Sequence, residues 1–150
     1  MNLQLCCSSC LFLINSIIAY YLNDKIYSIL FLLLFVTSII VHGLSPKKYI
    51  FTTILDKLSI LGIILYGGKV LFEKNYQLFY GDDLFESNLY IYKLGLTGLI
   101  LIAFLLTAFL YVYGYYCKDY CFNVDNYIAN TYHNFLHLNV FLGHLGIMIL

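Results

Sequence analysis

The stretch IYSILFLLLFVTSIIVH, residues 26–42, decides the fold class of this chain. It is almost continuously apolar, and a helix of this length nearly crosses the hydrocarbon core of a bilayer, which is about 30 Å thick and needs roughly 20 residues. The whole chain has 150 residues, of which 62% are hydrophobic and 11% charged, and its mean hydropathy is +0.84. A soluble domain is only about half apolar and about a quarter charged, so the sequence predicts an integral membrane protein.

Outward from residues 26–42, further apolar segments follow one another with polar connections between them. We predict about five transmembrane helices, at Leu3–Leu22, Ile26–His42, Ile50–Phe72, Leu89–Tyr116 and Tyr127–Leu150. The first segment lacks a basic start and a small-residue cleavage site, so we expect a retained helix rather than a secretory signal. Because no internal repeat and no linker is present, the expected fold is a single all-α bundle, a polytopic membrane domain covering residues 1–150.

The charged residues exclude one class of function. Eight lysines, with no arginine, balance eight aspartates and glutamates, so the formal net charge is zero. Without a basic tract, binding of nucleic acid through its phosphates is not expected. The lysines lie toward both ends of the predicted spans, so the positive-inside rule gives no orientation in the membrane.

Histidines within the apolar segments are the strongest candidates for a functional site, because polar side chains are expensive to place in a bilayer. His133 and His137, in YHNFLHLNVFLGHLG (residues 132–146), are spaced i,i+4. They therefore share one helix face about 6 Å apart along the axis, and such a pair can chelate a single metal ion. His144 lies about 10 Å further along the same stripe, and we expect it to pack between helices.

The number of predicted spans places further polar candidates on the same side of the membrane. His42 ends the second span, Asp56 lies in the first turns of the third, and His133 and His137 lie in the first turns of the fifth. One span more or fewer between Asp56 and His133 would separate these groups across the bilayer. The sequence therefore predicts one convergent site with His42 as the third imidazole. Three protein ligands with an open fourth position form the arrangement of a catalytic zinc site.

Three segments together resemble a known superfamily. TSIIVHG (residues 37–43) has Ser-x₃-His at the end of one span, TTILDKLSILGIILYGG (residues 52–68) has an aspartate opening the next, and residues 132–146 have His-x₃-His opening the last. This ordered set looks like the CREST superfamily, which comprises alkaline ceramidases, progestin/adipoQ receptors, haemolysin III and their relatives. The resemblance covers roughly residues 30–70 and 127–150. The family core has seven spans, and the loss of two would leave the predicted site on one side.

The resemblance implies a zinc-dependent membrane hydrolase. His42, His133 and His137 would hold Zn²⁺, and Ser38 and Asp56 would flank the attacking water. Asp56 would orient that water or take its proton, and Ser38 would bond to the water or to the developing oxyanion. The expected substrate is a membrane lipid with an acyl amide or ester bond, which would enter from the bilayer because apolar helices wall the site.

Other interpretations of these residues stay open. His42 alone could form an interhelical hydrogen bond or reach the lipid headgroups, Ser38 could bond back to its own helix, and Asp56 could be a first-turn carboxylate. The chain could then be a non-catalytic receptor or structural protein, or a haem-binding electron carrier. The pair Cys117-x₃-Cys121, followed by His133-x₃-His137, also resembles a zinc finger, although a finger needs a soluble unit outside the membrane.

Overall fold

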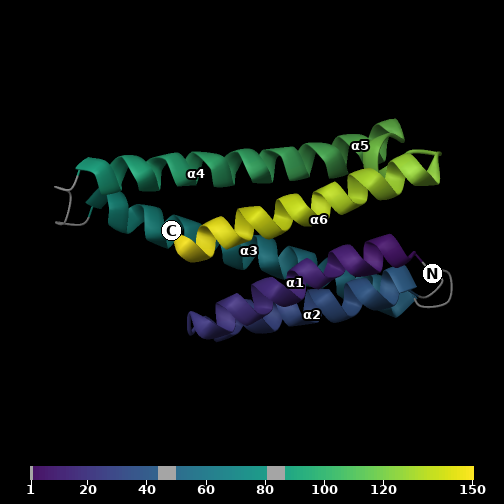
Figure 1. Cartoon of the computed structure of the whole chain (residues 1–150), viewed down its shortest axis with the longest axis horizontal. Coiled ribbons are helices and arrows are strands. Elements are labelled where there is room, and N and C mark those ends of the chain that lie inside the picture. The colour runs from purple at the N-terminus through teal and green to yellow at the C-terminus, as the bar shows by residue number, and fades with distance from the viewer. Residues whose placement is uncertain (1, 44–49, 81–86) are drawn as a thin grey trace.

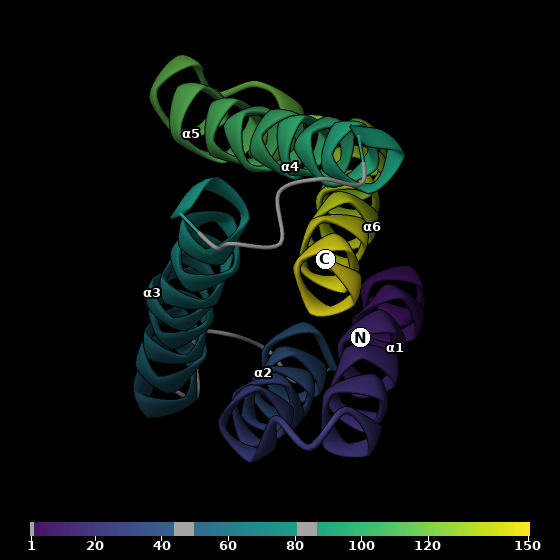
Figure 2. The same cartoon turned by 90° about the vertical axis from the view of Figure 1, so that its left-hand side faces the viewer.

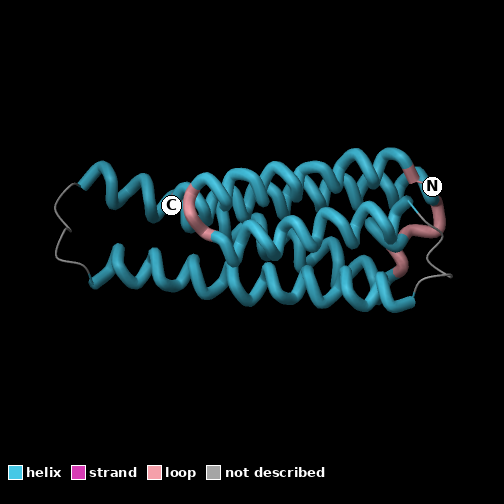
Figure 3. The backbone as a smooth tube through the Cα atoms, turned by 90° about the horizontal axis from the view of Figure 1, so that it is seen from below, coloured by secondary structure: helices cyan, strands magenta, loops and turns pink. Residues whose placement is uncertain are grey.

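The computed structural model of the chain describes residues 2–43, 50–80 and 87–150, apart from the side chains of residues 77–80, 87 and 88. Within these ranges the backbone is almost entirely helical and contains no strand (Figures 1 and 3). The elements are α1 (Leu3–Tyr21), α2 (Lys25–Gly43), α3 (Ile50–Tyr80), α4 (Ser87–Ala108), the π-helical turn η2 (Phe109–Tyr113), α5 (Gly114–Cys117), the 3₁₀ turn η3 (Tyr120–Phe122) and α6 (Asn126–Ile149). The predicted all-α class is confirmed. Polar loops were expected at Gly43–Tyr49 and Glu73–Asn88, but α3 continues through Glu73 to Tyr80 and α4 begins at Ser87. The rest of both expected loops, apart from Gly43, lies outside the described residues.

Among the described residues, four helical segments are long and apolar enough to cross a membrane. They are Leu3–Tyr21, Lys25–Gly43, Ile50–Tyr76 and Leu89–Cys117. They agree with the first four predicted spans to within a few residues, and the fourth runs from α4 through η2 into α5 without a break. Although α6 has 24 residues, it does not join this set, because three histidines and four asparagines lower its hydropathy. The described part of the chain is thus a helix bundle with four apolar helices of spanning length.

The first two helices form an antiparallel hairpin through a tight turn. The side chain of Asn2 accepts a backbone N–H of the first turn of α1 (3.3 Å), and Asp24 Oδ1 accepts one from α2 (3.0 Å). Between the two helices, Asn23 adopts a φ of 62°, a left-handed conformation that asparagine tolerates. The hairpin brings the start of α1 beside the end of α2, where the Asn2 N–H donates to the His42 carbonyl oxygen (3.0 Å).

An end-on view shows α6 between α4 and α1, and α2 between α1 and α3 (Figure 2). Polar contacts join these neighbours: Asn139 Nδ2 on α6 donates to the Ala103 carbonyl oxygen (2.6 Å) and to Thr107 Oγ1 (2.8 Å) on α4. Between α1 and α2, Ser16 Oγ donates to the Ser28 carbonyl oxygen (2.8 Å). Interhelical hydrogen bonds of this kind hold helices together where lipid removes most of the hydrophobic drive for association.

Large apolar side chains face outward along the helices. On α4, Leu99, Ile102 and Leu105 are 65%, 61% and 71% exposed and lie on one face. Contiguous apolar surface of this extent is unusual on a soluble monomer. It is the surface expected of a helix that faces lipid.

His144 on α6 lies in a buried junction with α2, α3 and α4. It is 1% exposed, its Nδ1 is hydrogen-bonded to the Tyr27 hydroxyl, and its ring contacts Phe31 and Phe104 with centroids 5.3 and 5.0 Å apart. Gly67 of α3 packs directly against this pair, since a Cβ there would lie 2.7 Å from Tyr27 Oη. The expectation that His144 packs between helices agrees with this arrangement.

Candidate metal centre

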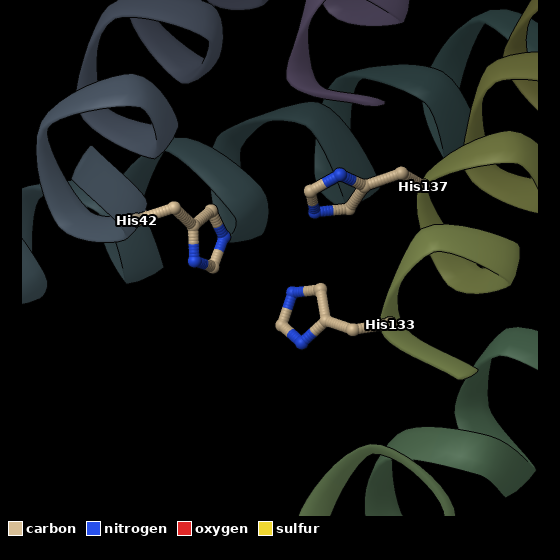
Figure 4. Close-up of side chains that lie close together, drawn as sticks. All are labelled: His42, His133 and His137. Carbon is tan, nitrogen blue, oxygen red and sulfur yellow. The ribbon is translucent and has the colours of Figure 1, made fainter. Parts of the chain in front are cut away.

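The described part of the chain brings three histidines together at one end of the bundle. The imidazole nitrogens of His42, His133 and His137, one from each ring, all lie within 4.8 Å of one another. The ring centroids are 4.9 Å apart for His42 and His133, 5.6 Å for His42 and His137, and 4.8 Å for His133 and His137. The three rings converge on a common space (Figure 4). These are the residues that the sequence predicted as metal ligands.

Local structure accounts for this convergence. His133 and His137 are one turn apart on α6, and His42 is in the last turn of α2. Asn2 joins the two helices, because its N–H donates to the His42 carbonyl oxygen (3.0 Å) and its Nδ2 donates to Asn130 Oδ1 on α6 (2.7 Å). The start of α1 is therefore hydrogen-bonded to both the end of α2 and the start of α6. Asn2 thus bonds to both helices that carry the three imidazoles.

Three imidazole nitrogens are a donor set of the kind that zinc accepts. Tetrahedral zinc with Zn–N bonds of about 2.0–2.1 Å places neighbouring nitrogens about 3.3 Å apart. The nitrogens here are separated by up to 4.8 Å, so the rings would have to come closer together to share one ion. His137 is 4% exposed, and His42 and His133 are half-buried. Three imidazoles supply three neutral ligands, so a bound ion would keep a fourth position open.

His137 is held from α1 as well as from its own helix. Its Nδ1 is 2.8 Å from Ser8 Oγ, and the edge of its ring packs against Phe12 with centroids 4.8 Å apart. Phe12 is itself 3% exposed. A metal-binding histidine commonly uses its second nitrogen in a hydrogen bond that fixes the ring, and His137 makes such a bond to Ser8.

Ser38 lies one turn before His42 on α2 and is buried. Its hydroxyl is 2.8 Å from Ser9 Oγ, and Ser9 Oγ donates to the Leu5 carbonyl oxygen (2.8 Å). Ser8 and Ser9 are consecutive, so α1 contacts both the histidine cluster and Ser38. Ser38 therefore belongs, with Ser8 and Ser9, to a layer of polar side chains next to the three histidines, called the polar layer below.

Asp56 reaches the same layer from α3. Its Oδ1 accepts a hydrogen bond from Thr37 Oγ1 (2.9 Å), and Thr37 is the neighbour of Ser38 in the chain. Among the hydrogen bonds of the described residues, none joins Ser38 or Asp56 directly to an imidazole of the cluster. Of the five predicted site residues, the structure thus groups the three histidines and places Ser38 and Asp56 in the adjoining layer.

Four polar residues that contribute to this region were not predicted: Asn2, Ser8, Ser9 and Thr37. Ser8 and Ser9 stand out in the sequence as hydroxyls in the apolar segment CCSSCLFL (residues 6–13). Ser9 also falls on the buried stripe of α1, which continues through Phe12. Two serines in an apolar span indicate a polar contact with another helix, but the sequence does not identify that helix.

The zinc-finger alternative is not supported by the described residues. The group of His, Cys, Asp and Glu side chains close enough to share an ion consists of His42, His133 and His137, without Cys117 or Cys121. Burial raises the pKa of the Cys121 thiol to about 11, which disfavours the thiolate that a metal requires. The five cysteines of the chain are free thiols in the structure.

No family model, no curated protein and no solved structure matches this chain. The chemistry of the histidine cluster therefore rests on its own donor atoms and their surroundings.

Proposed function

We propose that this chain is a zinc-dependent membrane hydrolase that cleaves an acyl amide or ester bond of a lipid. The observation that carries the proposal is the convergence of the His42, His133 and His137 nitrogens within 4.8 Å, from two helices of an apolar bundle. The ordered motifs that resemble the CREST superfamily favour the same chemistry. The proposal includes α6 as a fifth membrane span, which puts the cluster near one face of the bilayer.

Several polar groups of α6 bond to neighbouring helices, which makes them compatible with a span. Asn139 bonds to α4, His144 bonds to Tyr27 of α2, and the Phe141 carbonyl oxygen accepts from Asn15 Nδ2 of α1 (3.3 Å). Lys74 of α3 donates to two carbonyl oxygens in the last turn of α6, at 2.8 and 3.0 Å. At about 1.5 Å per residue, the 24 residues of α6 extend about 36 Å, enough to cross the hydrocarbon core.

A zinc ion with three imidazole ligands would, when bound, supply a Lewis acid that polarises an acyl carbonyl and lowers the pKa of a water to about 7. The residues of this chain would bind the ion and position the water. His42, His133 and His137 would hold the ion. Asp56, oriented by the Thr37 hydroxyl, would hold the proton that water releases, and Ser38 would orient the water. Water adds across the acyl bond, so the products are a fatty acid and an amine or an alcohol.

The apolar surface of the bundle favours a lipid as the substrate. The helices present exposed leucine, isoleucine and phenylalanine side chains to the surroundings, among them Phe51 and Ile54 at the start of α3. These two positions precede Asp56 on the same helix. A substrate that diffuses in the bilayer would meet this surface first, with its acyl chain in lipid and its polar bond near the cluster.

A structural zinc site is the second candidate, and one observation favours it. Ser38 and Asp56 are hydrogen-bonded to Ser9 and Thr37 rather than to the histidines. In that case the ion would join α2 to α6 at the end where Asn2 already bridges them, and the protein would be a non-catalytic membrane receptor or structural protein.

Metal content and turnover separate these candidates. Elemental analysis of the purified protein in lipid nanodiscs is expected to give about one zinc per chain, lost in His133→Ala and His137→Ala. Cys121→Ala is the control and is expected to retain zinc. The zinc-loaded protein should hydrolyse a ceramide-like amide or an acyl ester. Stoichiometric zinc without hydrolysis would favour the structural site, and absence of zinc would reject both candidates.

A further inference from the structure

The hydroxyl of Ser8 makes two contacts with only one hydrogen. Ser8 Oγ lies 3.1 Å from the carbonyl oxygen of Leu5, to which it donates, and 2.8 Å from Nδ1 of His137. A carbonyl oxygen can only accept, so the Ser8 hydrogen is used on Leu5 when both contacts are hydrogen bonds. The second bond then requires a hydrogen from the imidazole. Both bonds form together only when His137 Nδ1 is protonated and donates to Ser8 Oγ.

This direction determines which nitrogen of His137 is available as a ligand. A neutral imidazole carries one N–H, so a hydrogen on Nδ1 leaves the lone pair on Nε2. In Figure 4, one ring nitrogen of His137 lies on the side of the purple α1 ribbon, and the other faces the space between His42 and His133. The contact with Ser8 identifies the first nitrogen as Nδ1. The nitrogen that faces the cluster is therefore Nε2.

We infer that Ser8 is a positioning residue of the metal centre: it accepts the Nδ1–H of His137 and so presents Nε2 to the ion. The inference rests on the proposed zinc site. Phe12 supports it, because its ring packs edge-on against His137 and restricts the rotation that would break the bond to Ser8. The first helix of the chain thereby takes part in metal binding without providing a ligand.

The neighbouring serine provides a matched control. Ser9 also donates to the Leu5 carbonyl oxygen, at 2.8 Å, but its other partner is Ser38 instead of a histidine. Ser8→Ala and Ser9→Ala therefore remove the same group, one position apart, from the same helix and the same carbonyl acceptor. Only Ser8→Ala removes the acceptor for His137.

Zinc affinity is measured by competition with a chelator, using the full chain in nanodiscs. Ser8→Ala is expected to weaken binding about 10–100-fold, as losses of outer hydrogen-bond partners do. Ser9→Ala should leave the affinity unchanged, and Ser8→Thr should restore it because the hydroxyl is kept. Equal affinities for Ser8→Ala and Ser9→Ala, whether both are weakened or both are unchanged, would overturn the inference.

The tautomer gives a second readout that needs no metal. Nitrogen NMR of histidine-labelled, metal-free protein should show His137 with its hydrogen on Nδ1 in the wild type, and a changed tautomer population in Ser8→Ala. A wild-type protein with the hydrogen on Nε2 would refute the role of Ser8. If the wild type binds no zinc but has the expected tautomer, the proposed function fails while the Ser8–His137 bond stands.

Discussion

Gly67→Ala tests the packing of α3 against the rest of the bundle. A Cβ at position 67 would lie 2.7 Å from Tyr27 Oη, 2.8 Å from His144 Cε1 and 3.0 Å from His144 Nδ1. Neither ring can move aside freely, because Tyr27 is 0% and His144 is 1% exposed and both contact Phe31. Either α3 moves outward or the hydrogen bond between Tyr27 and His144 breaks.

The magnitude follows from these contacts. Overpacking a well-filled core costs about 1–3 kcal/mol, and loss of one buried hydrogen bond costs about 1 kcal/mol more. Alanine is favoured over glycine in a helix by about 1 kcal/mol, which offsets part of this sum. We therefore expect Gly67→Ala to lower the free energy of unfolding by about 1–3 kcal/mol.

Gly68→Ala provides the internal control. A Cβ at Gly68 meets nothing within 4 Å, so this variant gains the helix propensity without a clash. The two variants should differ by about 2–4 kcal/mol, or roughly 5–15 °C in the midpoint of thermal unfolding in detergent. Zinc content should be retained in both folded proteins, because His144 is not a ligand. Equal midpoints would refute the close approach of α3 to Tyr27 and His144.

Three further predictions concern topology, catalysis and thiol reactivity. Tags at the two termini are expected to be accessible from opposite sides of the membrane, since five spans are an odd number, and same-side accessibility would remove α6 as a span. Asp56→Ala should lower turnover of a fatty amide by on the order of 10²–10⁴, as loss of a general base does, and Ser38→Ala should also lower turnover, while zinc content is kept in both. A parallel loss of zinc would show that these variants disturb the ligands instead. Burial raises the pKa of the Cys121 thiol to about 11, so its thiolate should form only as the pH approaches that value. Maleimide labelling at neutral pH should therefore be much slower at Cys121 than at the exposed Cys117. Equal labelling rates would contradict the burial of Cys121.

The sequence could predict the helices and the histidine cluster because both depend on spacing along the chain. Apolar runs give the spans, an i,i+4 interval puts His133 and His137 on one face, and the count of spans puts His42 at the same end of the bundle. Hydropathy is less informative for α6, whose asparagines and histidines make it polar. Several of these side chains bond to other helices, and the composition of α6 alone does not reveal those bonds.

The partners of the cluster could not be predicted for a different reason. Ser8 and His137 are 129 positions apart, and Asn2 and Asn130 are 128 apart. Their contacts depend on which helices are neighbours, and in a membrane bundle the apolar faces alone do not determine this, because lipid competes for the same surfaces. Small polar residues decide the pairing, and each has many possible partners until the helices are arranged.

The hydrogen bonds around Ser38 limit the role that this residue could have in the proposed hydrolysis. Ser9 donates its only hydroxyl hydrogen to the Leu5 carbonyl oxygen, so the hydrogen in its 2.8 Å contact with Ser38 comes from Ser38. Ser38 then presents lone pairs and can accept from a water, but it can donate to an oxyanion only after releasing Ser9. Asp56 in its ionised form is likewise an acceptor: Thr37 Oγ1 lies 2.9 Å from Asp56 Oδ1 and 3.2 Å from the Leu34 carbonyl oxygen, and its single hydrogen goes to the shorter contact. Two acceptors beside the three histidines would suit the two hydrogens of the water in the proposed reaction. Of the two roles expected for Ser38, this arrangement favours the orientation of water over the stabilisation of the oxyanion.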